Sequence, residues 1–137
     1  MKFGLFGINN GILADPAIAS RTVKAAEAAG FESVWTGEHI VLPDPQVPPS
    51  PSAPQTPFAD TSTWLAFLAG QCETLKLGTG IIILPQRNPV ELAKELATVD
   101  VASQGRLLFG LGAGYLEPEF RAMGIRFEDR GERTDEY

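Results

Sequence analysis

The sequence contains a single cysteine, Cys72, and a single histidine, His39. One cysteine cannot form a disulfide within the chain, so we expect a reducing compartment and infer a cytoplasmic location. A structural zinc site draws its four protein ligands chiefly from cysteine and histidine, and the sequence offers one of each. We therefore expect no metal site.

Basic clusters and long apolar runs are also missing. Eleven Lys and Arg residues stand against 17 Asp and Glu, for a net charge of -6, so nucleic acid is not an expected partner. No apolar run approaches the roughly 18 residues of a membrane helix, and the N-terminus does not resemble a signal peptide. The 137 residues, 44% of them apolar, instead fit one globular domain or part of one.

Short apolar runs alternate with helical patterns along the whole chain. We expect four strands, at residues 2–8, 31–40, 75–84 and 106–112. Helices are expected after them, at 16–29, 62–72, 89–103 and 117–123, and another begins at 132. The nearly all-apolar run 75–84 indicates a central strand of a parallel sheet, flanked by 31–40 and 106–112. Strands that alternate with helices predict parallel βαβ units.

Local signals set the limits and faces of these helices. Asp15 before Pro16 and Asn88 before Pro89 combine an N-cap residue with a proline at the first helical position. Three glycines stand where helices end, namely Gly30, Gly105 and Gly124. Spacing predicts the buried faces as Ile18, Thr22, Ala25 and Ala29 in the first helix, and Leu92, Leu96, Val99 and Ser103 in the third.

Two architectures fit this order, an open doubly wound sheet and a (β/α)8 TIM barrel. A dinucleotide-binding sheet carries a glycine-rich fingerprint in its first turn, which residues 7–11 do not match. The later segment 110–115 comes close, but Tyr115 replaces the third glycine. A complete barrel needs about 250 residues. Residues 1–137 would then form its N-terminal half, ending within the helix after strand four.

Seven of the eleven prolines fall in residues 43–57, directly after the second expected strand. This composition predicts a long extended loop without helix or central strand. Loops at the carboxyl ends of barrel strands cover the active site. The loop is therefore a lid, a substrate-selecting wall or a disordered insertion.

Several motifs together resemble the luciferase-like monooxygenase superfamily, and their joint spacing covers nearly the whole chain. They are Trp35-Thr36-Gly37-Glu38-His39, Leu77-Gly78-Thr79-Gly80-Ile81, Pro85-Gln86-Arg87-Asn88-Pro89, Ala93-Lys94, Ala97-Thr98-Val99-Asp100, Gly105-Arg106, Gly110-Leu111-Gly112-Ala113-Gly114-Tyr115, Glu119-Phe120, Gly124 and Arg130-Gly131. The greatest similarity is to the coenzyme F420-dependent branch, whose members use a deazaflavin. The resemblance implies a TIM barrel, in agreement with the strand–helix order, and members are longer than this chain by about half a barrel.

The same resemblance implies an oxidoreductase that transfers hydride between an organic substrate and coenzyme F420. The alternative is a monooxygenase that uses reduced FMN and O2. An interpretation outside catalysis is that the chain is a truncated non-catalytic fragment or a half barrel that dimerises. Relatives dimerise through the helices corresponding to 62–72 and 89–103, so we expect a homodimer. The substrate is a small molecule that the sequence does not identify.

Site residues follow from the matching motifs. The resemblance implies that His39 is catalytic and lies beside the flavin, although a strand-capping histidine also fits its position. It implies a cofactor site at Gly78, Thr79, Gly80 and Ile81, where the Gly80–Ile81 bond is cis or at least forms a bulge, and also at Ala113 and Gly114. Related sugar-phosphate dehydrogenases have glutamate where this chain has Tyr115, which suggests a more apolar substrate wall.

Charged neighbours of these motifs have simpler interpretations. Glu38 is a weaker substrate-side candidate, because successive strand residues point to opposite faces and His39 takes the inner one. Glu117 and Glu119 suit the solvated first turn of a helix. Arg87 could bind an anionic ligand, but a surface ion pair is the favoured interpretation. Because the cofactor phosphate in such barrels binds after strands seven and eight, we expect these 137 residues alone to be inactive.

Overall fold

The computed structural model describes all 137 residues and contains a four-stranded parallel sheet with the order β1-β2-β3-β5. Its strands are β1 Gly4–Phe6, β2 Ser33–Thr36, β3 Lys76–Thr79 and β5 Leu107–Leu108. A second parallel pair is formed by β4 Ile82–Ile83 and β6 Leu111–Gly112. The helices are α1 Pro16–Ala28, α2 Thr61–Ala69, α3 Pro89–Ala102, α4 Glu117–Ala122 and α5 Arg130–Glu136. This order confirms the predicted alternation.

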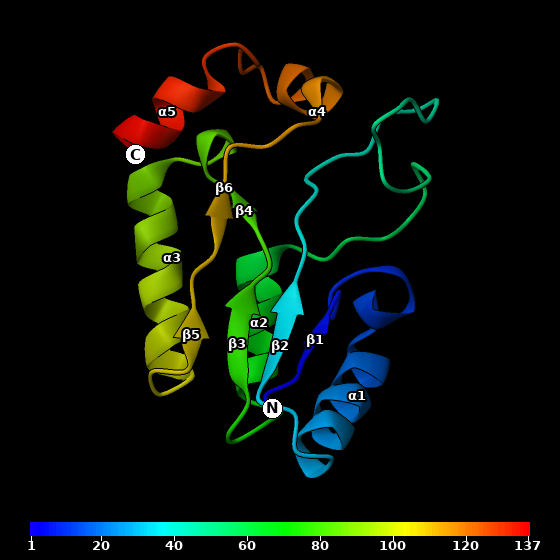
Figure 1. Cartoon of the computed structure of the whole chain (residues 1–137), viewed down its shortest axis with the longest axis vertical. Coiled ribbons are helices and arrows are strands. Elements are labelled where there is room, and N and C mark those ends of the chain that lie inside the picture. The colour runs from blue at the N-terminus through cyan, green and yellow to red at the C-terminus, as the bar shows by residue number, and fades with distance from the viewer.

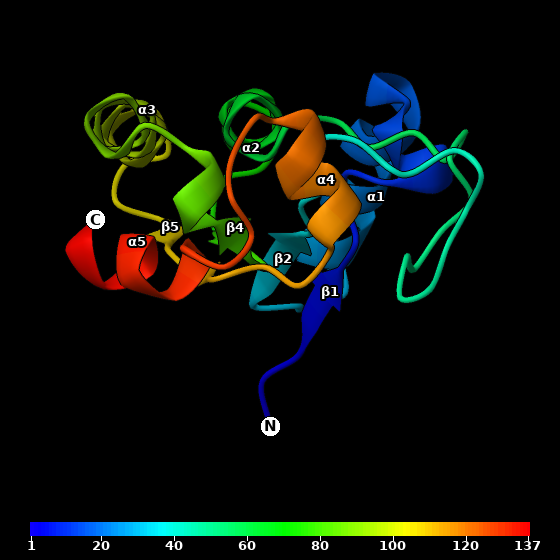
Figure 2. The ribbon, with the colours of Figure 1, turned by 90° about the horizontal axis from the view of Figure 1, so that it is seen from above.

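One face of the sheet is covered by α1, α2 and α3, whereas α4 and α5 lie beyond the carboxyl ends of the strands (Figures 1 and 2). Leu5, Val34, Leu77 and Leu107 lie side by side in the parallel register and face the helices. The main core forms where Val34 and Leu77 meet helical residues such as Leu65. None of the helices combines the length and apolarity that crossing a membrane requires.

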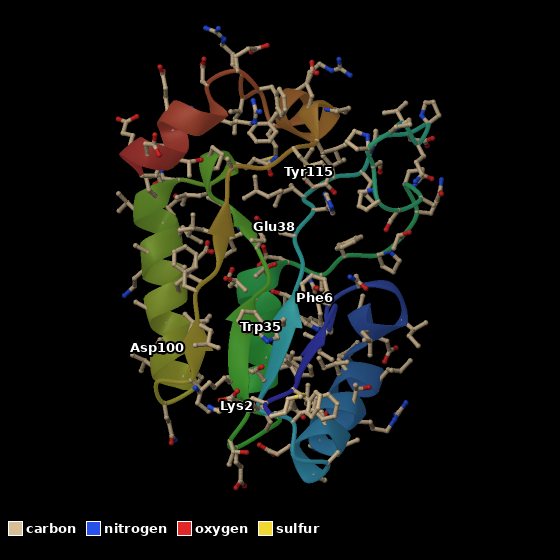
Figure 3. All side chains as sticks on the ribbon, viewed as in Figure 1. Lys2, Phe6, Trp35, Glu38, Asp100 and Tyr115 are labelled. Atoms are coloured by element: carbon tan, nitrogen blue, oxygen red, sulfur yellow. The ribbon has the colours of Figure 1, made fainter.

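The other face of the sheet carries no helix. Phe6, Trp35, Gly78 and Leu108 occupy neighbouring positions of the register on this side, and the Phe6 side chain is 65% exposed. Figure 3 shows Phe6 and Trp35 on this face, away from α2. Burying exposed apolar surface of this kind is favourable, so the face is built to be covered.

The predicted strand 75–84 is interrupted at Gly80 and Ile81, and a short 3₁₀ turn over Leu84–Gln86 follows β4. The cis peptide bonds of the chain are Asp44–Pro45 and Pro48–Pro49, so the predicted cis bond between Gly80 and Ile81 is wrong, although the strand is irregular at these two residues. The interruption arises from a close approach, because a Cβ on Gly80 would lie 1.9 Å from the Thr36 carbonyl oxygen.

The predicted strand 106–112 is broken at the same level and divides into β5 and β6. Thr79 Oγ1 donates to the Gly110 carbonyl at 2.7 Å and accepts from the Gly110 N–H at 2.7 Å. The Gly110 carbonyl also accepts from the Ile82 N–H at 3.0 Å. These bonds hold the two interrupted strands together, with Arg106–Gly112 beside Leu75–Leu84 as expected.

The helix signals are confirmed more fully in α3 than in α1. Asp15 and Asn88 accept hydrogen bonds from the first backbone N–H groups of α1 and α3, as predicted. In α3 the predicted face Leu92, Leu96, Val99 and Ser103 is buried. In α1 the buried residues are Ala19, Val23 and Ala26, so the predicted face is wrong by one position. Alanines lie on both sides of α1, and their spacing does not distinguish the sides.

The Pro-rich segment 43–57 contains neither helix nor strand, as predicted. Its end is fastened to the turn after β1, where the Gly11 N–H donates to the Pro57 carbonyl at 3.0 Å. The Ala59 N–H donates to the Asn9 carbonyl at 2.9 Å, and Asn10 forms a β-bridge with Phe58. The loop therefore leaves at the end of β2 and returns beside the end of β1.

We expect Gly80→Ala to lower the free energy of unfolding by about 1–3 kcal/mol, because its methyl group forces the β2 and β3 ends apart. Gly131→Ala is the matched control, since it lies within α5 and its new methyl group meets no atom within 4 Å. The control should leave stability unchanged or raise it by up to about 1 kcal/mol. Denaturant unfolding measures both, and equal effects of the two would refute the close-approach argument.

Candidate active site

A cavity of about 340 Å³ lies at the carboxyl ends of the strands. Its lining comes from separate segments of the chain and includes Phe6, His39, Phe58, Gly80, Ile81 and Tyr115. Pro51 and Ser52 bring the Pro-rich loop to the same cavity. Figure 3 shows Glu38 and Tyr115 toward this end of the molecule, with Phe6 below them. The structure thus brings His39, Gly80, Ile81 and Tyr115 together, although the sequence separates them by up to 76 positions.

His39 follows β2 and is held on both sides of its ring. Its Nδ1 lies 3.2 Å from Oε2 of Glu119, and its Nε2 lies 3.5 Å from the Tyr115 hydroxyl. The rings of Phe58 and Tyr115 meet the imidazole edge to face, with centroids 5.4 and 6.1 Å away. The side chain is 8% exposed. A histidine held in this way can exchange a proton with a group bound in the cavity.

Glu119 is buried, so its assignment to a solvated helix turn is wrong. Besides His39, its carboxylate accepts hydrogen bonds from the backbone N–H groups of Ile40 and Val41. Glu117, two residues earlier in α4, is exposed as expected. Sequence spacing alone could not separate the two, because the partners of Glu119 lie 78 to 80 positions away. The signal available was the Glu119-Phe120 motif, whose phenylalanine is fully buried.

Arg87 belongs to a partly buried ion-pair network, so the predicted surface pair is also wrong. Its guanidinium donates to Glu38 and, at 2.8 Å, to Asp60 at the N-terminus of α2. Glu38 also accepts from the Ile83 N–H of β4. Glu38 lines the cavity, but its carboxylate is committed to these partners and is 2% exposed. The network ties the ends of β2 and β4 to the start of α2.

The charges of this region follow from burial and from these contacts. Burial raises the pKa of Glu38, although Arg87 and the Ile83 N–H act in the opposite direction. Burial alone would raise the pKa of Asp60, but the Thr63 N–H and Arg87 outweigh it and lower the value to about 2. Burial, reinforced by the charge of Glu119, raises the pKa of Tyr115. Tyr115 therefore faces His39 as a neutral phenol near neutral pH.

Asn9 is a positioning residue in the turn after β1, and no motif in the sequence marks it. Its Oδ1 accepts from the Gly37 N–H at 2.9 Å, and its Nδ2 donates to the carbonyls of Gly37 and Ala59 at 2.8 and 2.7 Å. The buried amide thus fixes the backbone just before Glu38 and His39 and the return of the Pro-rich loop. Its full set of partners is what a buried amide requires.

The other expected cofactor residues lie outside this cavity. A Cβ on Gly78 would strike the Trp35 ring at 2.1 Å, so this glycine makes room for the tryptophan. Thr79 is buried and bonded to Gly110. Gly114 has a φ of +79° and packs against Phe120 and Ile83, and Ala113 precedes it without reaching the cavity. No group of three or more His, Cys, Asp or Glu side chains is placed to hold a metal ion.

The Arg87 network generates a stability prediction. Arg87→Met leaves the Glu38 carboxylate buried without its cation, and we expect a loss of about 3–5 kcal/mol in unfolding free energy. The double variant Glu38→Gln/Arg87→Met removes the stranded charge and should be less destabilised than Arg87→Met. Lys2→Met, which breaks the exposed pair with Glu32, is the control and should leave the unfolding midpoint unchanged. The account would be contradicted if the double variant lost as much unfolding free energy as Arg87→Met, or more.

Comparison with known proteins supports the fold and the family resemblance. The sequence profile of the luciferase-like monooxygenase family matches residues 2–137. The oxygenase component of the flavin-dependent trigonelline monooxygenase of Acinetobacter baylyi is 32% identical over 113 residues, which are 81% of this chain and 28% of that protein.

Two solved structures superpose on nearly the whole chain. Monooxygenase RslO1 from Streptomyces bottropensis matches with a TM-score of 0.75 and 30% identity, covering 99% of this chain and 40% of that one. The coenzyme F420 dependent tetrahydromethanopterin reductase from Methanopyrus kandleri matches with a TM-score of 0.65 and 26% identity, covering 92% and 30%. The chain therefore spans less than half the length of these relatives.

The neighbours are TIM barrels, and this chain supplies four parallel strands with their helices. The predicted partial (β/α)8 barrel is thus confirmed, and the helix-free face of the sheet corresponds to a barrel interior. By its family profile, its relatives and its strand order, the chain belongs to the luciferase-like monooxygenase family.

Proposed function

We propose that the protein is an oxidoreductase that binds a flavin or deazaflavin ring against Gly80 and Ile81, with His39 as its catalytic residue. The observation that carries this proposal is that the single histidine of the chain faces the same cavity as the interrupted backbone of β3. When bound, such a cofactor supplies hydride or oxygen transfer to an organic substrate.

The residues present fit the ring of such a cofactor. Gly80 offers backbone without a side chain, and Phe6, Phe58 and Ile81 supply apolar surface to exclude water. His39 and Tyr115 provide the polar groups of the cavity. His39 Nε2 takes up or releases the proton that accompanies reaction, and the Tyr115 hydroxyl donates toward it. Pro51 and Ser52 form a wall on the substrate side.

The relatives support two forms of this chemistry. Oxygenation with reduced FMN comes first, because the similar proteins at 30% identity or more with named activities are monooxygenases, one of them named flavin-dependent. Hydride transfer with coenzyme F420, the expectation from sequence, takes support from the F420 dependent reductase at 26% identity. The site residues serve both, since each form needs a ring surface and a proton-exchanging group beside it.

Cofactor titration tests the proposal in the protein as its gene encodes it. FMN and coenzyme F420 are each added while fluorescence is followed, and we expect one of them to bind. His39→Gln should keep this binding and lower turnover by about 10²- to 10⁴-fold, the usual contribution of a general acid or base. Glu117→Gln, an exposed neighbour, is the control and should behave as the wild type. Failure of both cofactors to bind, or full turnover in His39→Gln, would overturn the proposal.

The same titration addresses the alternative that residues 1–137 act as a non-catalytic half barrel. In TIM barrels the cofactor phosphate is commonly held by loops after strands seven and eight, which lie outside the four strands present here. We propose that residues 1–137 alone bind the cofactor more weakly than a complete barrel by orders of magnitude, because charge-assisted hydrogen bonds to phosphate are lost. Equal affinity would show that the half barrel suffices.

We further propose a homodimer formed through α2 and α3, which lie side by side and are joined by the Ser62–Glu95 hydrogen bond at 2.9 Å (Figure 2). Trp64 and Phe67 of α2 pack largely on the core, which leaves little of them for an interface. The contact would instead form at Ala93 and Ala97 of α3, which are exposed and small enough to let the α3 helices of two copies approach closely.

Light scattering of the gene product tests the homodimer. We expect a dimer mass for the wild type and a monomer mass for Ala93→Glu/Ala97→Glu, because the new charges are buried without partners. Ala25→Glu/Ala28→Glu on the exposed side of α1 is the control and should remain dimeric. A wild-type monomer, or a dimer that survives the α3 substitutions, would contradict this interface.

A further inference from the structure

Glu119 is a buried carboxylate whose side-chain hydrogen-bond partner is an imidazole rather than an arginine or lysine. The residue is 1% exposed, and no Lys or Arg lies within ion-pair distance of it, so its basic neighbour is the ring of His39. Arg87, the cation on the other side of the site, is committed to Glu38 and Asp60. The oxygen atoms of a buried carboxylate need hydrogen-bond donors. The donors that Glu119 binds therefore indicate its structural role.

The two oxygens of Glu119 have separate tasks. Oε1 accepts from the backbone N–H groups of Ile40 and Val41, and Oε2 faces Nδ1 of His39 at 3.2 Å. All three donors belong to consecutive residues after β2, whereas Glu119 lies in the first turn of α4. One carboxylate therefore fixes the ring of His39 and the start of the Pro-rich loop together.

This arrangement determines which nitrogen of His39 carries the hydrogen. An ionised carboxylate only accepts hydrogen bonds, so Nδ1 must be the donor. In the neutral ring Nε2 is then an acceptor, and it faces the Tyr115 hydroxyl, which can donate to it across 3.5 Å. Phe58 and Tyr115 hold the ring edge to face and oppose its rotation.

We propose that Glu119 is a positioning residue that holds neutral His39 in the tautomer with hydrogen on Nδ1, so that Nε2 presents its lone pair to the cavity. Glu119 itself does not line the cavity and touches no reacting atom. The role of Nε2 as the proton-exchanging atom rests on the function proposed above, whereas the tautomer follows from the contacts of Glu119 alone. In this arrangement His39 begins the reaction as a base rather than as an acid.

Replacing Glu119 with glutamine should place the hydrogen of His39 on the other ring nitrogen. The N–H groups of Ile40 and Val41 still require an oxygen, so the amide oxygen of Glu119→Gln takes the place of Oε1. The amide NH2 group then faces Nδ1 and donates to it. His39 can accept this bond only with its hydrogen on Nε2. The variant should therefore invert the tautomer rather than merely loosen the ring.

Nitrogen NMR of protein labelled with ¹⁵N-histidine reads the tautomer directly and needs no cofactor. Spectra are recorded at about pH 8.5, where imidazole is neutral, and the His39 signals are assigned by their loss in His39→Gln. We expect the Nδ1–H pattern in the wild type and in the control Glu117→Gln, and the Nε2–H pattern in Glu119→Gln. Steady-state kinetics of Glu119→Gln should show kcat reduced about 100-fold or more with KM nearly unchanged.

The wild-type spectrum alone is sufficient to overturn the proposal, so it does not depend on the variant folding. An Nε2–H pattern in the wild type, or an unchanged tautomer in folded Glu119→Gln, refutes the positioning role. The predicted tautomers in a protein that binds neither FMN nor coenzyme F420 would instead refute the proposed function and leave the role of Glu119 standing.

Discussion

The close approach of β3 to the end of β2 is the constraint on which the site depends. At Gly80 the third strand passes the Thr36 carbonyl at a distance that leaves no room for a Cβ atom. The strand breaks there and resumes as β4, which brings the Ile83 N–H to the Glu38 carboxylate. The same break leaves Gly80 and Ile81 facing the cavity beside His39. A regular strand through this position would pair its backbone with its neighbours and close that surface.

Buried polar side chains hold the loops that surround the cavity, and each joins segments that are distant in sequence. Asn9 links the turn after β1 to Gly37 and Ala59. Arg87 links Glu38 to the start of α2, and Glu119 links α4 to the residues after β2. Asn9 has all its amide groups bonded, whereas Nε of Arg87 is buried without a hydrogen-bond partner. The Pro-rich loop, in contrast, is fastened near its end to the turn after β1, and Pro51 and Ser52 in its middle line the cavity.

Local sequence signals were sufficient for the framework and insufficient for the buried charges. Capping residues, helix-ending glycines and apolar runs depend on neighbours within a few positions, and they predicted the strand–helix order and the buried face of α3. The prediction of the buried face of α1 was wrong because alanine occurs on both sides of this helix. Glu119 and Arg87 were assigned to the surface because their partners lie 27 to 80 positions away, and no local pattern reveals them.

The central claim is that His39, Gly80 and Ile81 surround one cofactor ring while Glu119 holds the histidine from behind. A crystal structure of the gene product with its oxidised cofactor tests this most directly. The account predicts the ring plane in contact with the backbone at Gly80 and Ile81, Nε2 of His39 directed toward the ring, and Nδ1 still bonded to Glu119. A ring bound elsewhere, or an imidazole turned so that Nδ1 leaves Glu119, would contradict it.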